Sequence, residues 1–470
     1  MGVVCLRRTA GRASSSRRGA MKNIVTRTGR DARQNTPEPS GNSPRGLGVS
    51  WGGTCGIFPT SVELLLRWFS SSSPAQVLRA RLLHRTRRSR IGASPPKGLI
   101  MSVHTIPQQR AETPAGQVSG LLDVQEKSAF IRAEHLPGPG DVRLPVERVR
   151  QLGLRRGDHV VASVAGNKPA AVQSVNGLTE WRDRPRFEEL TPVHPDERLV
   201  IETGSLSTRV IDLVAPIGKG QRGLIVAPPK AGKTMVLQAL AAAVTRNHPE
   251  VHLMVVLVGE RPEEVTEMRA SVQGEIFSST FDHPDRDHAA VAELALERAK
   301  RLVEGGGDVV LLLDSLTRLG RAYNNLAPGG GRVLTGGIDA RALYPPKRFF
   351  GAARNVEGGG SLTILASALV DTGSRMDNSL YEEFKGTGNM ELHLARDLAE
   401  RRLFPAVDLE ASGTRREEML LHPQERQVIW RLRRTLAGLD RQQALETLVG
   451  KLRATPSNAA FLLEALRAAA

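Results

Sequence analysis

Residues 224–234 read LIVAPPKAGKT, a short apolar run followed by a loop of proline, glycine and lysine. The apolar run predicts a strand, and Thr234–Thr245 has the pattern of a helix. A loop that ends in Gly-Lys-Thr between a strand and a helix is typical of the Walker A motif, although Ala227 stands where that motif has its first glycine. Because amides at the start of a helix complement phosphate charge, the stretch predicts a nucleotide site.

The residue types of this loop suggest specific roles. We expect Lys233 to reach the terminal phosphates of ATP and Thr234 to offer its hydroxyl to Mg²⁺. The remaining expected ATP-binding residues are their neighbours in the loop and the first helical turn: Pro228, Pro229, Lys230, Ala231, Gly232 and Met235.

A second apolar strand ends in an acid, since residues 308–315 read DVVLLLDS. Asp314 fits the Walker B role, in which the carboxylate holds the water shell of the metal ion. Taken alone, an aspartate that closes such a strand is more often a helix cap. Its distance of about 80 residues from Lys233 favours the metal role.

A third strand is followed by several acids, in residues 253–264, LMVVLVGERPEE. A carboxylate just past a strand that neighbours the Walker A strand can orient and deprotonate an attacking water, and Glu260 has that position. Glu263 and Glu264 follow Pro262 in the first turn of a helix, where acids favour the helix dipole. We therefore interpret those two as structural.

From Gly223 onward, apolar strands alternate with helices. The strands are predicted at Leu224–Val226, Leu253–Val258, Val309–Leu313 and Leu362–Leu369, and helices at Thr234–Thr245, Glu263–Ser271 and Asp287–Glu304. Nearly continuous apolar strands in such an alternation indicate an α/β fold whose parallel sheet is covered on both faces.

Shorter strands precede this region. Five alternating runs within residues 111–178 predict a small β-barrel, at Gly120–Asp123, Ser128–Arg132, Asp141–Pro145, His159–Val164 and Ala170–Val175. Residues 179–199 are rich in proline and charge and form a predicted connector. Residues 200–470 form the larger α/β domain, with helices after His422.

Residues 1–110 differ from the rest in charge. They hold 19 of the 65 basic and three of the 49 acidic residues, so the remaining chain carries 46 charges of each sign. We interpret them as a disordered, basic, low-complexity segment that either binds polyphosphate or is a solvated tail. A transit peptide, or a natural start at Met21 or Met101, are alternatives.

The compartment is predicted from cysteine and apolar content. Both cysteines, Cys5 and Cys55, lie in the basic segment, which leaves the rest without disulfides, as in a reducing cytosol. No apolar run is long enough to span a membrane. The sequence therefore favours a cytoplasmic protein without a membrane partner.

Three longer runs resemble one family. They are VGERPEEVTEM at 258–268, KRFFGAARN at 347–355 and YEEFKGTGNM at 381–390, and they are similar to the transcription termination factor Rho family. The similarity extends from about Pro192 to Leu448 and includes Asp141–Gly157 and Leu178–Leu199. Residues 1–110 do not take part in it.

The resemblance implies a function and a set of partners. It implies a homohexameric, RecA-like P-loop ATPase and helicase that uses ATP and Mg²⁺ and binds single-stranded nascent RNA. Such a ring translocates 5'→3', unwinds the RNA–DNA hybrid and releases the transcript from the RNA polymerase elongation complex, with Nus-type elongation factors as further partners.

The resemblance also assigns catalytic residues. Lys233, Thr234, Glu260 and Asp314 keep the roles given above. Arg415 resembles the arginine finger that reaches the γ-phosphate of the neighbouring subunit, while Arg261 and Lys385 resemble residues of the same catalytic interface. Phe404 resembles the aromatic residue that stacks on adenine.

Two loops resemble the RNA-contacting pore loops of the family. Glycine lets a loop approach a sugar–phosphate backbone closely, and arginine supplies charge without reading bases. The predicted contacts are Arg332, Val333, Leu334, Thr335, Gly336 and Gly337 in the first loop, and Thr372, Gly373, Ser374 and Arg375 in the second.

The predicted barrel resembles the cold-shock or OB-like primary RNA site of the family. That site stacks bases on several aromatics, whereas here only Phe130 remains, beside Arg132. Arg143 and Ser128 stand where aromatics are usual. We expect weak, salt-sensitive RNA binding by Phe130, Arg132 and Arg143.

Two alternatives remain open at this point. Another RecA-like ring ATPase, of rotary or secretion type, would share the Walker motifs but not the pore-loop and Arg415 runs. A divergent regulatory RNA-binding paralogue would explain the reduced aromatic platform. Gly259, where the family often has aspartate, predicts altered sensitivity to the family's natural inhibitor.

Overall fold

The computed structural model describes residues 116–165 and 168–468. The predictions for residues 1–110 lie outside this range. Among the helices in these two segments, none is both long and apolar enough to cross a lipid bilayer.

The five strands predicted before residue 178 all form, in one antiparallel sheet of order β3-β2-β1-β4-β5. They are β1 (Gln117–Val124), β2 (Ala129–Arg132), β3 (Val142–Leu144), β4 (His159–Ala165) and β5 (Lys168–Val175), with helix α2 (Val146–Gln151) between β3 and β4. Leu122, Ile131 and Val160 are fully buried in its core. No ladder joins β3 to β5 within the described residues, so the OB-like barrel closure is not confirmed.

The larger sheet has nine strands, in the order β11-β10-β12-β16-β9-β17-β18, with β15 beside β16 and β6 beside β15. The strands from β11 to β17 in this order pair in parallel. Their bounds are β6 (Pro192–Val193), β9 (Arg222–Ala227), β10 (His252–Glu260), β11 (Glu275–Thr280), β12 (Asp308–Asp314), β15 (Arg354–Val356), β16 (Ser361–Leu369), β17 (Met390–His393) and β18 (Gly413–Thr414). The predicted parallel sheet is thus confirmed.

Two hydrophobic cores explain the continuous apolar runs. Along β10, Val255 and Leu257 face one core, whereas Met254, Val256 and Val258 face the other. Successive side chains of a strand point to opposite faces, so a strand covered on both sides needs apolar residues at every position.

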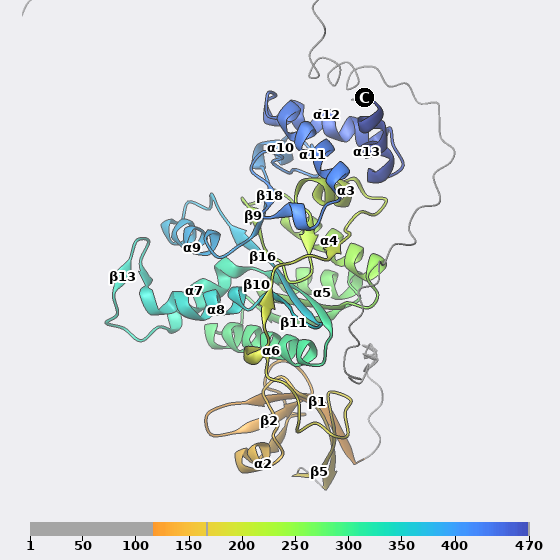
Figure 1. Cartoon of the computed structure of the whole chain (residues 1–470). Coiled ribbons are helices and arrows are strands. Elements are labelled where there is room, and N and C mark those ends of the chain that lie inside the picture. The colour runs from red at the N-terminus through yellow and green to blue at the C-terminus, as the bar shows by residue number, and fades with distance from the viewer. Residues whose placement is uncertain (1–115, 166–167, 469–470) are drawn as a thin grey trace, which may run out of the picture. The chain divides into compact units, whose positions relative to one another are not determined.

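The helices divide between these cores (Figure 1). The first core includes α3 (Leu206–Val214), α4 (Lys233–Asn247), α5 (Pro262–Ser271), α10 (Arg396–Glu400), α11 (Pro423–Leu436), α12 (Arg441–Arg453) and α13 (Asn458–Arg467). The second includes α6 (Asp285–Glu304), α7 (Leu316–Leu326), α8 (Tyr344–Gly351) and α9 (Arg375–Lys385). The three predicted helices appear as α4, α5 and α6.

Short elements complete the described chain. They are the strands β7 (Arg198–Leu199), β8 (Ile217–Gly218), β13 (Val333–Leu334) and β14 (Ile338–Asp339), and the 3₁₀ turns η1 (Phe187–Glu189), η2 (Ala340–Leu343) and η3 (Glu417–Met419). Strand β6 of the predicted connector pairs with β15, so the connector is part of the larger sheet.

Candidate nucleotide site and candidate RNA-contacting loops

The loop between β9 and α4 has the backbone of a phosphate-binding turn. Lys230 and Gly232 both adopt positive φ, 66° and 93°, and α4 begins at Lys233 directly afterwards. The first amides of a helix have no intrahelical acceptor, so they form a ready anion site at the end of β9. The predicted ATP-binding residues of this loop therefore surround one helix start, with Met235 exposed beyond it.

Lys233 joins two carboxylates from neighbouring strands. Its Nζ donates to Glu260 Oε1 at 3.0 Å and to Asp314 Oδ1 at 2.5 Å. Burial alone would lower the pKa of Lys233, but the charges of Asp314 and Glu260 raise it. The carboxyl ends of β10 and β12 meet at this edge of the sheet, which brings the three predicted residues together.

The surroundings of Glu260 favour its protonated form more than water does. Burial, and then the charge of Asp314, raise the pKa of Glu260 to about 7, against the lowering effect of Lys233. A base whose pKa lies near the working pH is well matched to removing a proton from water.

The candidate metal residues are oxygen donors. Asp314 also accepts a hydrogen bond from Ser367 Oγ at 2.8 Å, and half-buried Thr234 lies in the first turn of α4. Mg²⁺ prefers one or two such protein oxygens together with phosphates and water. The donor set fits Mg²⁺, and Asp314 and Thr234 would hold it.

Arg318 is a site residue that the sequence reasoning missed. Its Nε lies 3.1 Å from Glu260 Oε1, and its Nη2 donates to Oε2 at 3.3 Å. Gly259, which precedes Glu260, has a φ of 64°, and the pairing register of β10 with β11 shifts between Val258 and Glu260. A bulge at this point turns the Glu260 carboxylate toward Lys233 and Arg318. The only signal in the sequence was the position of Arg318 one turn after Asp314.

Phe404 lies beside the phosphate loop, although 170 residues separate it from Thr234. A Cβ added to Gly232 would be 3.7 Å from Phe404 Cε1. Phe404 is 38% exposed. Its stacking on adenine stays a prediction.

The two predicted pore loops meet. The first forms a hairpin, in which β13 pairs with β14 around Gly336 and Gly337, and Arg332 and Val333 are exposed. A Cβ at Gly336 would lie 2.7 Å from the carbonyl oxygen of Arg375 at the start of α9. In the second loop, Thr372 Oγ1 donates to buried Asp377 at 2.6 Å. Arg375 is exposed.

The chain is similar to a family of nucleotide-binding domains and to bacterial termination factors. Residues 207–414 match the ATP synthase alpha/beta family, nucleotide-binding domain. The chain is 72% identical over 350 residues to the transcription termination factor Rho of Streptosporangium roseum, a match that covers 73% of this chain and 91% of that protein.

This chain belongs to the transcription termination factor Rho family.

Other Rho proteins are longer. The one from Streptomyces lividans is 61% identical over 362 residues, and the one from Mycobacterium tuberculosis is 57% identical over 365. Both matches cover 74% of this chain but only 51% and 61% of those proteins, so the chain spans little more than half of their length. Together with the P-loop fold, these relatives identify an ATPase of a transcription termination family.

A solved structure supports the fold alone. The ATPase of a type III secretion system of pathogenic bacteria superimposes with a TM-score of 0.50 at 20% identity, over 59% of this chain and 87% of that one. The secretion-type alternative shares the core architecture but lacks the high identity of the Rho relatives, and it is not favoured.

The predicted Rho interface residues make no direct polar contact with the Lys233 cluster, although Arg261 follows Glu260 in the chain. Arg415 follows β18, and its amide donates to the Asn389 carbonyl oxygen at 2.8 Å, beside a cavity of about 280 Å³ that Glu391 also lines. Lys385 Nζ lies 5.7 Å from the centre of the Tyr381 ring. Exposed Arg261 donates to Glu264 at 2.6 Å. In the described part of the chain, no hydrogen bond or ion pair joins these three cations to Lys233, Glu260 or Asp314.

The predicted RNA-binding residues of the small sheet differ in their exposure to solvent. Phe130 is half-buried and stands opposite exposed Arg143 in the β2–β3 register, so these two share one face. The side chain of Arg132 is 4% exposed and pairs with Asp123 and Asp141 at 2.6 and 2.5 Å. RNA contact by Arg132 therefore requires these buried ion pairs to open, whereas Phe130 and Arg143 are accessible.

Proposed function

We propose that this Rho-family chain is an RNA-dependent ATPase and helicase that works as a homohexamer. It translocates 5'→3' on nascent single-stranded RNA in the cytoplasm and releases the transcript from the RNA polymerase elongation complex, assisted by Nus-type factors. One observation supports this most: Glu260, the candidate base, contacts Arg318 of α7. The same helix contacts Gly337 of the first predicted RNA loop and Asp377 of α9, to which Thr372 of the second loop also donates.

The site residues bind the phosphates, hold the metal ion and activate the attacking water. Lys233 and the amides of α4 bind the phosphates, Asp314 and Thr234 hold Mg²⁺, and Glu260 takes a proton from the attacking water. When Mg²⁺ is bound, it supplies charge neutralisation to the phosphates. Phe404 stacks on adenine, and Arg332, Arg375 and their neighbours contact the RNA backbone.

Arg415 completes the site of the next subunit. It lies outside the Lys233 cluster of its own chain, as a finger that acts in trans must. We expect Arg415→Ala to abolish RNA-stimulated turnover, a loss of about 10³–10⁵-fold, while nucleotide binding stays nearly intact. The measurement is ATP hydrolysis with poly(C) and with an unstructured RNA, beside nucleotide binding by fluorescence.

A mixing experiment separates action in trans from damage to the fold. Arg415→Ala and Glu260→Gln subunits are each inactive alone, but mixed rings contain some sites with an intact Glu260 and an intact neighbouring Arg415. Partial recovery of RNA-stimulated hydrolysis is the expected result. Wild-type turnover by Arg415→Ala, or no recovery on mixing, would contradict the assignment of Arg415.

A further inference from the structure

Helix α7 contacts the nucleotide site, the first RNA loop and the residue that anchors the second RNA loop. Its Arg318 pairs with Glu260. Its Arg321 donates to Asp377, behind the second loop, at 2.8 and 2.6 Å. Its Asn324 donates to the Gly337 carbonyl oxygen of the first loop at 3.3 Å. A small displacement of α7 would therefore be felt at the base and at both loops.

A fourth contact leads from α7 toward the small sheet. Tyr323 Oη donates to Glu293 Oε1 on α6 at 2.7 Å, and the other oxygen of Glu293 accepts from Arg156 Nη1 at 2.8 Å. Arg156 Nε in turn donates to Asp123 Oδ1 of β1 at 2.9 Å. Asp123 also holds Arg132, which lies on the strand of the candidate RNA residue Phe130.

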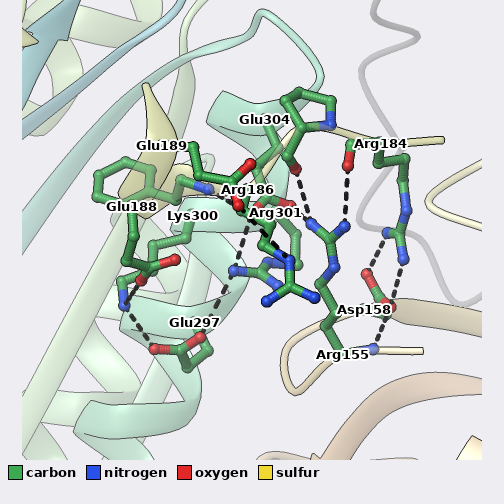
Figure 2. A network of polar contacts seen from close by, with 12 residues as sticks. Arg155, Asp158, Arg184, Arg186, Glu188, Glu189, Glu297, Lys300, Arg301 and Glu304 are labelled. Atoms are coloured by element: carbon green, nitrogen blue, oxygen red, sulfur yellow. Dashed lines mark hydrogen bonds and ion pairs between the residues drawn. The ribbon is translucent and has the colours of Figure 1, made fainter. Parts of the chain in front are cut away.

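A second part of the junction with α6 is a buried clamp around Glu304, which Figure 2 shows. Glu304, whose side chain is 2% exposed, accepts from Arg155 at 3.0 Å and from the Phe187 amide at 2.9 Å, and pairs with Arg301 at 2.9 Å. Arg184 of the connector pairs with fully buried Asp158 at 2.5 Å. Breaking a buried ion pair is costly, so this clamp holds one geometry.

The link through Arg156 and Glu293 is more exposed to solvent than the clamp around Glu304. Their side chains are 25% and 44% exposed, so water can replace either partner at low cost. The junction thus combines a buried clamp with more exposed links, and the link through Arg156 and Glu293 reaches α7.

We propose that Arg156, Glu293 and Tyr323 are positioning residues that transmit RNA binding on the small sheet to α7, and through it to Glu260 and the pore loops. RNA phosphates beside Phe130 and Arg143 compete with Asp123 for Arg132, and Asp123 then holds Arg156 more strongly and weakens the pair between Arg156 and Glu293. This inference rests on the proposed function and adds the path by which the two RNA sites communicate.

The test compares two RNAs on the full chain at saturating ATP. Poly(C) reaches both the small sheet and the pore loops, whereas a cytidine hexanucleotide occupies one site at a time. We expect Tyr323→Phe and Glu293→Gln to keep the maximal rate with the hexanucleotide but to lose about fivefold or more of the additional rate with poly(C).

Matched variants make the result specific. Tyr344→Phe removes the hydroxyl of a tyrosine that is 70% exposed, and it should behave as wild type. If the three residues act as one chain, Arg156→Gln combined with Tyr323→Phe loses no more than either change alone.

The inference is overturned if both single variants retain the full poly(C) advantage, if the rates with the two RNAs fall equally, or if the double variant is additive. Absence of stimulation by any RNA in the wild-type protein would instead overturn the proposed function itself, and this inference with it.

Discussion

At the scale of residues, the site is an arrangement of charges that nucleotide binding must change. Lys233 is held by Glu260 and Asp314, and Arg318 adds a second cation to Glu260. A bound phosphate offers Lys233 a new anionic partner. We expect Lys233 then to leave Glu260, which would keep its pair with Arg318 while it acts as the proposed base.

The pH dependence of hydrolysis tests the state of Glu260. Its pKa is raised to about 7, chiefly by burial, and the base works only when deprotonated, so kcat/KM should rise as pH increases through about 7. Arg318 lowers the pKa of Glu260, so Arg318→Ala should move the midpoint of this rise to higher pH. The measurement is a pH profile of kcat/KM for ATP. A profile that is flat between pH 6 and 8, or a midpoint that Arg318→Ala does not move, would contradict this role.

At the scale of elements, the contact between the two RNA loops depends on a missing side chain. Gly336 and Gly337 share the same φ of 80°, but only Gly336 closely approaches the Arg375 carbonyl oxygen and Ser379. A Cβ at Gly337 meets nothing within 4 Å. Alanine at either position causes the same backbone strain, but only alanine at Gly336 adds a steric clash. A comparison of the two variants therefore distinguishes the two effects.

We expect Gly336→Ala to reduce RNA-stimulated hydrolysis about tenfold more than Gly337→Ala does. Both changes cost about 1 kcal/mol of backbone strain, but only the first pushes the hairpin away from α9. Steady-state ATPase rates with poly(C) provide the comparison, with nucleotide binding as a check on folding. Equal losses in the two variants would show that the contact between the loops has no functional weight.

At the scale of the whole described molecule, the junction between the small sheet and the larger domain contains neutral histidines. His135 stacks on Phe277 of β11 with ring centres 3.7 Å apart. His159 Nε2 and Ser119 Oγ share a hydrogen bond of 3.1 Å. Burial lowers the pKa of His135, and burial together with Arg298 lowers the pKa of His159 to about 4. Between them lies Glu275, whose pKa His252 and Arg298 lower to about 2 despite its burial.

These shifts predict that acid weakens the junction. A histidine whose folded pKa is depressed contributes stability that is complete above its ordinary pKa of about 6.5 and is lost as pH falls toward its folded pKa. Glu275 acts in the same direction but at lower pH, because its stabilising carboxylate is lost only as pH falls from about 4.5 toward about 2. Glu260, whose folded pKa is raised to about 7, acts in the opposite direction over the same pH range, so the test compares two proteins. When the pH is lowered from 7 to 5, the melting temperature of His159→Gln should rise relative to that of the wild-type chain. An unchanged difference between the two melting temperatures would contradict the assignment of His159.

Local sequence determined much of this protein. The run LIVAPPKAGKT specifies a strand, a phosphate loop and a helix within eleven neighbouring residues, because apolar periodicity and glycine geometry act over short distances. The positions of Lys233, Thr234 and Asp314, the parallel sheet and the helices α4, α5 and α6 were predictable for the same reason.

Tertiary packing decided the remainder. Arg318, Ser367 and Glu293 lie in ordinary helix and strand patterns, and only the side-by-side placement of β10, β12, β16 and α6–α7 gives each its partner. The burial of Arg132 likewise depends on Asp123 and Asp141, which come from a different strand and from a loop. Contacts between residues far apart in the chain are set by how the layers stack, and no local spacing encodes them.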